Sequence, residues 1–318
     1  MSSDAALATA ATTSGGAAAG RARLGRMARS GRDTGRRVVA VGAAVVLLLA
    51  AWETYKAVGP ADGLELLGTR VLPRASDAAM PHTWTVLAVL GEPEVAVAAS
   101  RTVGEAVLAA AATTLLLSLG GLALGAGVGL LLAVAMARLR VVEHGLLPWV
   151  LLSQTVPLIA VAPLVAGWGG GIAIMGRPWT SEMSVVVVAA YLAFAPVAVG
   201  ALRGLQSPAP AALELFTASA ASWTQTLVRL RLPASVPYLV PALRLSAAAA
   251  VVGVVVAEIS TGTRGGIGRL VIEYAQQATT SPARVYAAVL GAATIGLVVA
   301  GLVALLDVAL RRAREGAS

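Results

Sequence analysis

The sequence predicts an all-α protein that crosses a membrane about six times, with both ends on the inner side. Of its 318 residues, 58% have hydrophobic side chains and only 13% are charged, whereas soluble domains carry about 25% charged residues. The mean hydropathy is +0.81. The 34 glycines and the aromatic content of 4% suit closely packed helices, because a membrane β-barrel needs alternating segments and aromatic girdles.

Residues 1–37 are predicted to form a disordered basic arm on the inner, cytoplasmic side. Residues 1–20 are mostly Ala, Ser, Thr and Gly, and seven arginines follow them. The apolar run 38–52 comes next and is predicted to be the first span. A signal peptide, including a twin-arginine signal at Arg36 and Arg37, is the alternative. An uncleaved helix is favoured because several more apolar runs follow.

An external segment, 53–101, precedes a second, longer span. Four prolines exclude a span within 53–101 but leave room for a short helix. No charged residue occurs in 106–137, which is longer than a bilayer core requires. Small residues at every fourth position of this run predict one face that a neighbouring helix can approach closely; a general bias towards alanine and glycine is the alternative. These residues are Gly121, Gly125, Gly129, Ala133 and Ala137.

The next uncharged run, 145–176, is irregular. Pro148, Pro157 and Pro163 and several later glycines interrupt it. Broken backbone at membrane depth is tolerated where it is buried in protein or lines a cavity. We therefore predict a broken span that contributes to an internal site.

Three regular spans complete the six predicted membrane spans. The first of them contains Pro196, which predicts a kink. The membrane domain is predicted to cover 38–312, and 313–318 to form a short cytoplasmic tail. The three spans are 183–202, 232–257 and 285–306.

The basic residues orient the chain. The formal charge of +8 comes from 24 basic and 16 acidic residues. With the N-terminus inside, the inner segments hold 16 basic residues and the outer segments hold 8. Such an excess is typical of cytoplasmic loops and predicts an N-in/C-in topology. Membrane orientation therefore explains most of the excess of basic residues, and no nucleic-acid partner is expected.

Missing residues exclude several kinds of chemistry. The chain has no cysteine, its two histidines are far apart, and no zinc-protease or serine-hydrolase motif occurs. A phosphate-binding P-loop requires Gly-Lys-Ser/Thr, but the only lysine, Lys56, lies between Tyr55 and Ala57. We expect no catalytic residue, no cofactor and no metal site in this chain. Any transport must then be driven by a partner or by a gradient.

The segment 207–241 carries the most specific pattern. Apolar residues spaced 3, 4, 3, 4 and 3 apart predict the stripe of one amphipathic helix. Pro233, Pro237 and Pro241 are predicted to break the helix after it. Such a helix can lie on lipid headgroups or dock in a groove of another protein, and its periodicity does not decide between them. The stripe is Leu213, Phe216, Ala220, Trp223, Leu227 and Leu230.

This segment resembles the EAA motif in the permease subunits of binding-protein-dependent ABC importers. The motif reads Glu-Ala-Ala, three residues, Gly, and nine residues before Ile-x-Leu-Pro. The spacing in this sequence fits throughout, with alanine at the glycine position and both motif alanines replaced. The corresponding residues are Glu214, Leu215, Phe216, Ala220, Leu230, Leu232 and Pro233.

In that family the loop lies in a cleft of the ATP-binding subunit, so the resemblance implies that 207–238 is a coupling loop. Glu214 would have a coupling role rather than only favouring the helix dipole. Trp223 can pack on its own domain or on the ATPase, and the two arginines can contact lipid headgroups or the ATPase. The implied coupling residues are Glu214, Ala220, Trp223, Arg229, Arg231, Leu232 and Pro233.

Two further segments are similar to one branch of that family, which imports nitrate, sulfonates, taurine, and pyrimidine or riboflavin-type vitamins and precursors. Residues 153–164, with the Gly-Trp-Gly that follows at 167–169, match its Q-T-x-P-x-x-A-x-A-P-L and W-x-G pattern. Glu258 and the glycine-rich loop after it match the branch's acidic residue and loop. The resemblance covers about residues 100–312. The segment 170–184 is longer than this pattern implies, and nothing in its sequence explains the difference.

The resemblance implies a type I ABC importer permease fold in the bacterial plasma (inner) membrane. Implied partners are an ABC ATPase, an extracytoplasmic solute-binding protein, a second permease copy in a homodimer, and a small solute. The solute is a nitrate-, sulfonate- or taurine-like anion, or a thiamine-pyrimidine- or riboflavin-like precursor. A gradient-driven secondary transporter or channel is the alternative function, and a membrane enzyme is a third.

Four residues are predicted to line the translocation path. An amide and freed backbone carbonyls can bind a small polar solute, although helix-packing kinks explain the prolines equally well. Glu258 follows an uncharged run, and such ionisable groups tend to be functional; gating, pairing with Arg264 and contact with the binding protein are its alternatives. The residues are Gln154, Pro157, Pro163 and Glu258.

Overall fold

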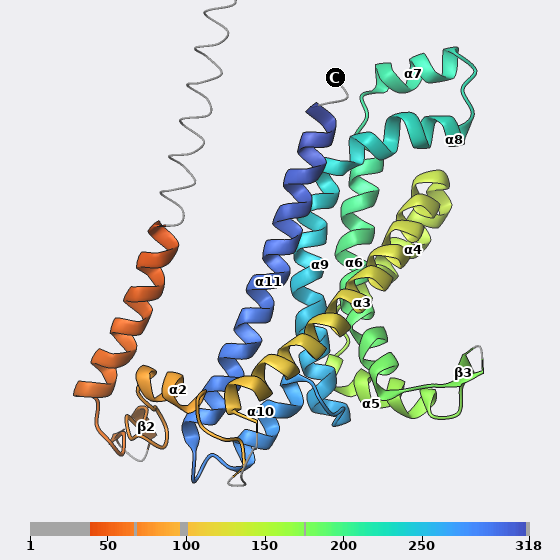
Figure 1. Cartoon of the computed structure of the whole chain (residues 1–318). Coiled ribbons are helices and arrows are strands. Elements are labelled where there is room, and N and C mark those ends of the chain that lie inside the picture. Colours follow the sequence, from red (N-terminus) through yellow and green to blue (C-terminus); the bar gives the residue numbers. More distant parts are fainter. Residues whose placement is uncertain (1–38, 67–68, 96–100, 175, 316–318) are drawn as a thin grey trace, which may run out of the picture. The chain divides into compact units, whose positions relative to one another are not determined.

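The computed structural model describes residues 39–66, 69–95, 101–174 and 176–315 (Figure 1). The predicted N-terminal arm and the last three residues of the predicted tail lie outside the described residues. Helices make up almost all of the described secondary structure, which confirms the all-α prediction. The chain divides into two compact units at Thr83.

The first unit contains the helix Val39–Val58 and a short antiparallel hairpin. The helix is long and apolar enough to cross a membrane. It continues past the predicted end of the first span at residue 52, because the polar side chains of its last turns are satisfied within the unit. The hairpin strands are β1 (Leu64–Leu66) and β2 (Thr69–Leu72).

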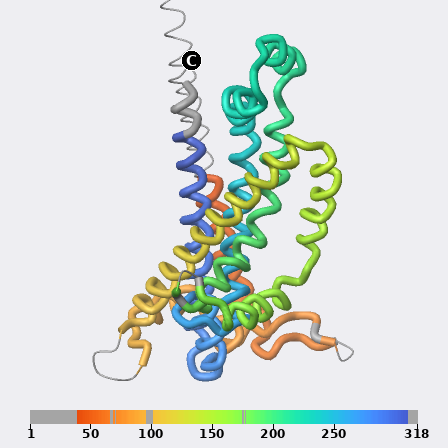
Figure 2. The backbone as a smooth tube through the Cα atoms, turned by 90° about the vertical axis from the view of Figure 1, so that its right-hand side faces the viewer, coloured from red at the N-terminus to blue at the C-terminus, as the bar shows by residue number. Residues whose placement is uncertain are grey.

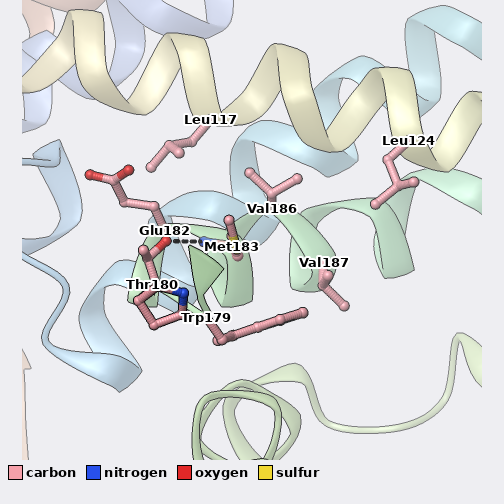
Figure 3. Close-up of a pocket in the computed structure, with 9 residues that line it drawn as sticks. Leu117, Leu124, Trp179, Thr180, Glu182, Met183, Val186 and Val187 are labelled. Atoms are coloured by element: carbon pink, nitrogen blue, oxygen red, sulfur yellow. Dashed lines mark hydrogen bonds between the residues drawn. The ribbon is translucent and has the colours of Figure 1, made fainter. Parts of the chain in front are cut away.

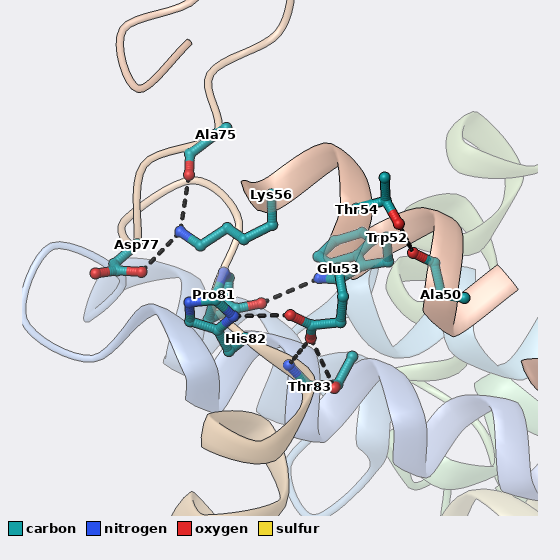
Figure 4. A network of polar contacts seen from close by, with 10 residues as sticks. All are labelled: Ala50, Trp52, Glu53, Thr54, Lys56, Ala75, Asp77, Pro81, His82 and Thr83. Carbon is teal, nitrogen blue, oxygen red and sulfur yellow. Dashed lines mark hydrogen bonds and ion pairs between the residues drawn. The ribbon is translucent and has the colours of Figure 1, made fainter. Parts of the chain in front are cut away.

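A network of polar contacts links the end of this helix to the segment that follows (Figure 4). Lys56 Nζ lies 2.7 Å from an Asp77 carboxylate oxygen and donates to the carbonyl of Ala75 at 2.7 Å. The Lys56 ammonium lowers the pKa of Asp77 below its usual range. Glu53 contacts the His82 ring at 2.8 Å and accepts from the Thr83 N–H at 2.8 Å. The single lysine of the chain is therefore part of a structural contact.

The second unit contains the remaining spans. With the helix of the first unit, the described residues hold five helices that are long and apolar enough to cross a membrane, or six if a bent pair counts as one span. This agrees with the six predicted spans. The helices of the second unit are α3 (Val103–Arg138), the bent pair α4 (Arg140–Ser153) and α5 (Leu158–Gly169), α6 (Ser181–Leu205), α9 (Leu232–Thr261) and α11 (Pro282–Glu315).

Several short helices lie outside these spans. The helix α2 (Thr83–Val89) is the short helix for which the external segment left room. The helix α10 (Ile267–Gln276) follows α9 and buries Ile267, Leu270 and Tyr274 on one face. Burial raises the pKa of Tyr274 to about 12.

The predicted stripe of small residues on α3 is confirmed as a packing face. Gly121, Gly125, Gly129 and Ala133 are all buried, and α6 packs along them and against α9 on its other side. A Cβ built on Gly125 would lie 2.7 Å from Cβ of Ala193 and 2.8 Å from a carbonyl oxygen of α6. Glycine is needed there because the two backbones approach within contact distance.

The Gly125→Ala variant is expected to lower the free energy of unfolding by about 1–3 kcal/mol, because the added methyl group forces α3 and α6 apart. Gly127 is the matched control, since a Cβ at Gly127 would meet nothing within 4 Å. Gly127→Ala should be neutral or stabilising by up to about 1 kcal/mol, because alanine is the better helix former. Thermal unfolding in lipid nanodiscs compares the two, and equal melting temperatures would contradict the close contact.

Several predicted interruptions by proline are wrong. Pro148 and Pro163 lie inside continuous helices, and so do Pro237 and Pro241 of α9. Pro196 lies within α6, which continues past it as the predicted span does. Pro233 stands where the π-helical turn Leu227–Arg231 passes directly into α9, so the chain is helical on both sides of this proline too. Interior prolines are tolerated in a membrane bundle because neighbouring helices can satisfy the backbone groups that proline leaves without a partner. The real break of the third span lies between Ser153 and Leu158, where α4 and α5 bend by 102° (Figure 2).

Candidate functional site

A helical hairpin lies at one end of the second unit, between α6 and α9. It consists of α7 (Pro210–Ala218), α8 (Trp223–Thr226) and a π-helical turn, η1 (Leu227–Arg231), that runs directly into α9. The helix α10 lies at the other end of α9 (Figure 1). The hairpin therefore lies opposite α10, and it contains the predicted coupling residues up to Arg231, whereas Leu232 and Pro233 begin α9.

The interpretation of 213–230 as one continuous amphipathic helix is wrong, because the chain reverses between α7 and α8. The Ala221 N–H donates to the carbonyl of Phe216 at 3.0 Å, and the Ala220 N–H to that of Thr217 at 3.0 Å. These two bonds define a Schellman motif. The next helix starts at once, since Ser222 and Gln225 form a capping box.

Ala220 occupies the left-handed position of this turn. Its φ is 51°, and it is the only non-glycine residue with positive φ among the described residues. This is the position where the EAA motif has glycine, so the tight turn is kept although glycine is lost. Because a side chain at positive φ is strained, the turn is held by the hydrogen bonds and the capping box.

The Ala220→Gly variant is expected to stabilise the chain or leave it unchanged. Glycine removes about 1 kcal/mol of left-handed strain, and the greater freedom of the unfolded chain offsets part of that gain. Ala218→Gly, inside α7, is the control and should destabilise by about 1 kcal/mol. Thermal unfolding of both variants checks the turn, and a loss of stability in Ala220→Gly as large as in Ala218→Gly would contradict the assigned backbone.

The hairpin presents an exposed outer surface. No residue of α7 is buried; Glu214 is exposed and Leu215 is 65% exposed. Trp223 is half-buried against the unit itself, with the Arg138 guanidinium 4.9 Å from its ring centroid. Of the two alternatives for Trp223, the structure thus shows packing on its own domain.

The two arginines of η1 differ in their surroundings. Arg229 is exposed, whereas Nη1 of Arg231 donates to the carbonyl of Leu205 at 3.1 Å. Leu205 is the last residue of α6, and a cation at a helix C-terminus is favourable. Arg231 therefore ties the hairpin to the end of α6. Leu232 and Pro233 lie at the junction of η1 and α9.

The bend between α4 and α5 brings together three of the four predicted path residues. Gln154 ends α4 and Pro157 precedes α5, and both are exposed, as is Pro163 in the middle of α5. The Tyr191 hydroxyl of α6 donates to the carbonyl of Ser153 and so holds the bend. An amide and a break in the helix thus share one exposed surface.

Glu258 lies away from this bend and is fully buried, at 0% exposed. One carboxylate oxygen accepts from the Thr114 hydroxyl at 2.8 Å, and the other from the Gly268 N–H at 2.8 Å. Thr114 in turn accepts from the Ile267 N–H at 2.8 Å. The carboxylate and the threonine therefore satisfy the N-terminus of α10, where backbone donors lack helical partners.

The glycines that follow Glu258 belong to the same arrangement. A Cβ on Gly266 would overlap the Glu258 carboxylate, and a Cβ on Gly268 would lie 2.6 Å from the carbonyl of Val255. The acidic residue and the glycine-rich loop form one packed unit that joins α3, α9 and α10. Within the described part of the chain, Glu258 makes no contact with Arg264, the pairing that was one of its predicted alternatives.

Two features of this region escaped sequence analysis. Thr114 lies 144 residues from Glu258, and a threonine in an apolar span gives no sign of its distant partner. The unexplained segment 170–184 contains a small hairpin, β3 (Ala173–Ile174) and β4 (Arg177–Pro178), which turns through Gly176 at φ 79°. The glycines of this segment are the sequence feature from which a turn could have been predicted there.

The fold and these surfaces define the class of the protein. It is a multi-span helical membrane protein with an exposed hairpin at one end of its spans and a broken span beside them. Within the described residues, no group of three or more His, Asp or Glu side chains could hold a metal ion.

Comparison with known proteins identifies the family. The binding-protein-dependent transport system inner membrane component family matches residues 125–312, which is more than half of the chain. The chain belongs to this family and has its type I ABC permease fold. It is accordingly a multi-pass protein of the inner membrane, and its relatives are transport subunits rather than enzymes.

Three relatives have names that mention a solute. SsuC of Bacillus subtilis (strain 168), named as an aliphatic sulfonates transport permease protein, is 29% identical over 187 residues, which are 59% of this chain and 63% of SsuC. The formylaminopyrimidine transport permease protein ThiX of Halalkalibacterium halodurans is 34% identical over 49% of this chain and 58% of ThiX. The riboflavin transport system permease protein RibX of Chloroflexus aurantiacus is 33% identical over 42% of this chain and 47% of RibX. The chain thus spans less than two thirds of the length of each.

Proposed function

We propose that this chain is the membrane-spanning permease subunit of an ATP-driven importer for a small solute. The observation that carries the proposal is the hairpin α7–α8. It keeps the EAA spacing, exposes the acidic residue Glu214, and holds Ala220 in the backbone conformation that glycine would favour. The ATPase that hydrolyses ATP is then a separate subunit, with the hairpin in its cleft on the cytoplasmic side.

The position of the hairpin supports a route for coupling. The hairpin is continuous with α9 through η1, and Arg231 joins it to the last carbonyl of α6. Since α6 packs against both α3 and α9, a shift of the hairpin would move the central spans together. ATP binding would close the ATPase pair and switch the path between inward-facing and outward-facing states, and hydrolysis would reset it.

The path itself is proposed to lie between two permease copies. Large apolar side chains stand exposed on both arms of the broken third span, with Trp149 of α4 and Trp168 of α5 each 71% exposed. Gln154, Pro157 and Pro163 share that span and are the proposed path residues. A solute-binding protein would deliver the solute at the opposite, extracytoplasmic end. Glu258 would hold α10 at that end rather than line the path.

The solute is proposed to be one of the kinds that the relatives' names mention, an aliphatic sulfonate or a pyrimidine- or riboflavin-type compound. Family membership disfavours the alternative of a gradient-driven secondary transporter or channel. The excess of basic residues at the hairpin's end and in the N-terminal arm supports an N-in/C-in orientation.

Co-purification from native membranes tests the proposed function. A P-loop ATPase is expected to remain bound to the wild-type chain in mild detergent, and the Glu214→Arg variant is expected to lose it. Truncated hot-spot contacts cost about 2 kcal/mol or more, which weakens binding roughly 30-fold. A wild-type chain that purifies without any ATPase would refute the proposal.

A further inference from the structure

A pocket of about 690 Å³ opens between α3, the β3–β4 hairpin and α6 (Figure 3). Its volume lies within the range of about 300–1,000 Å³ that is typical of small-molecule sites. Trp179 lies on one side, and Leu117 and Leu124 of α3 lie on the other (Figure 3). The lining is mainly apolar, as such sites are, and the segment that the family pattern leaves unexplained contributes to it.

Trp179 is held in a fixed position. Its Nε1 donates to the Ser184 hydroxyl at 2.6 Å, and its backbone N–H donates to the carbonyl of Ile172 at 3.0 Å. A Cβ on Gly169 would overlap the indole ring, so the ring lies directly on the end of α5. An indole whose polar edge is already bonded can offer its remaining surface to an aromatic ligand.

Glu182 gives the pocket its charge. It is the only charged residue among the described residues that line the pocket. No hydrogen bond or ion pair of its carboxylate occurs within the described part of the chain. Its place in the first turn of α6 is favourable for a helix dipole, but a dipole effect does not require a pocket beside the carboxylate. Glu182 is exposed and stands at the edge of the apolar hollow, where a negative group would attract N–H donors and cations and repel anions.

The pocket is linked through its neighbours to the broken span that carries the proposed path residues. Val187 lines the pocket, and Tyr191, four residues further along α6, lies on the same face. The Tyr191 hydroxyl donates to the carbonyl of Ser153, next to Gln154. Trp179 packs on Gly169 at the opposite end of α5. Residues that line or adjoin the pocket therefore contact the end of α4 before the bend and the far end of α5.

We propose that this pocket is a solute site on the import path, and that it takes a small planar heterocycle with amino groups or protonated ring nitrogens. This inference rests on the proposed import function. The ring would stack on Trp179, and its N–H groups would donate to the Glu182 carboxylate, as charge-assisted hydrogen bonds do. An aliphatic sulfonate offers neither an aromatic face nor a donor, and its negative charge would lie beside Glu182.

Single-cysteine labelling tests the site directly, because the chain has no cysteine of its own. Leu117→Cys places a thiol in the pocket, and Leu116→Cys is the control at the same depth, 69% exposed and outside the pocket. Both variants are prepared with the bound ATPase in nanodiscs and labelled with a small methanethiosulfonate. The probes are 4-aminopyrimidine and ethanesulfonate. Val187→Cys on α6 replaces Leu117→Cys if the latter does not fold.

We expect 4-aminopyrimidine to slow labelling of Leu117→Cys by about tenfold at ten times its Kd, and to leave Leu116→Cys unaffected. Ethanesulfonate should protect neither thiol. Adding Glu182→Gln should weaken protection by 4-aminopyrimidine about tenfold, since a hydrogen bond to a charged group is lost. Absence of protection by the ring, equal protection by ethanesulfonate, or equal protection of Leu116→Cys would overturn the proposal.

The outcome is separable from that of the proposed function. If the ATPase co-purifies and ATP drives uptake, but the ring does not protect the pocket thiol, the pocket assignment fails and the importer assignment stands. If the ring protects the thiol in a chain that binds no ATPase, the importer assignment fails. The site would then belong to another kind of transporter.

Discussion

The Glu258→Ala variant is expected to unfold at a markedly lower temperature than the wild type, with a loss of roughly 2–5 kcal/mol. The carboxylate is fully buried and accepts from the Thr114 hydroxyl and the Gly268 N–H, both at 2.8 Å. Alanine leaves both donors without this acceptor in a region that excludes water, and it also opens a cavity under the glycine-rich loop.

Thermal unfolding in lipid nanodiscs, followed by hydrogen exchange of the α10 amides, measures this effect. The matched control is Glu273→Ala, which removes a carboxylate that is 44% exposed and pairs with Arg269 at 2.8 Å on the surface of α10. Exposed ion pairs contribute about 0–1 kcal/mol, so the control should melt close to the wild type. Equal melting temperatures for the two variants, with unchanged exchange in α10, would show that Glu258 does not anchor that helix.

The spans could be predicted from the sequence because each leaves a strong local signal. Uncharged runs longer than a bilayer core predict membrane helices whatever their partners. The small-residue stripe from Gly121 to Ala133 predicted the close approach of α6 because the four-residue spacing puts all its members on one helix face. What the stripe did not reveal was the identity of the neighbouring helix.

Proline positions misled the prediction for a physical reason. A single sequence shows that a proline removes one hydrogen bond, but not whether neighbouring helices compensate for the loss. Thus Pro163 and Pro237 lie within helices, whereas the bend falls before Leu158.

The hairpin shows where periodicity is ambiguous. A stripe with helical spacing from Leu213 to Leu230 fits one long helix as well as two short ones. The turn depends on Ala220 at positive φ, which a propensity argument would assign to glycine. Only the resemblance to the EAA motif marked that position as a turn.

Long-range contacts lay beyond any local pattern. Glu258 stood out because it follows an uncharged run, yet its partners come from α3 and α10. Contact with a binding protein would require an accessible side chain, and the Glu258 side chain is fully buried in this structure. The pocket beside Trp179 likewise depends on residues from three separate elements.

Altering the exposed surface of α7 is the second change with a large expected effect. Glu214→Arg combined with Leu215→Asp alters two exposed residues of α7, neither of which supports the fold. We expect ATP-driven uptake to fall to the level without ATP, because the hairpin no longer fits the ATPase surface. The weakening of that contact is roughly 30-fold or more. Trp223→Ala is a poorer probe, since Trp223 packs within its own unit.

The control reverses an acidic charge, as Glu214→Arg does, at a place away from the hairpin. Asp62→Arg reverses an exposed charge outside the part of the chain that matches the family. The free energy of unfolding of both variants should lie within about 0.5 kcal/mol of the wild-type value, as is usual for surface substitutions. A difference in uptake between them would then come from the hairpin itself.

Solute uptake into proteoliposomes is the most direct measurement of the central claim. The complete complex is reconstituted with its ATPase and with the solute-binding protein encoded beside it, and the solute retained by that binding protein is used. The account predicts ATP-dependent uptake for the wild type and for Asp62→Arg, and none for Glu214→Arg with Leu215→Asp. Wild-type uptake that proceeds equally without ATP, or that survives the hairpin variant unchanged, would contradict it.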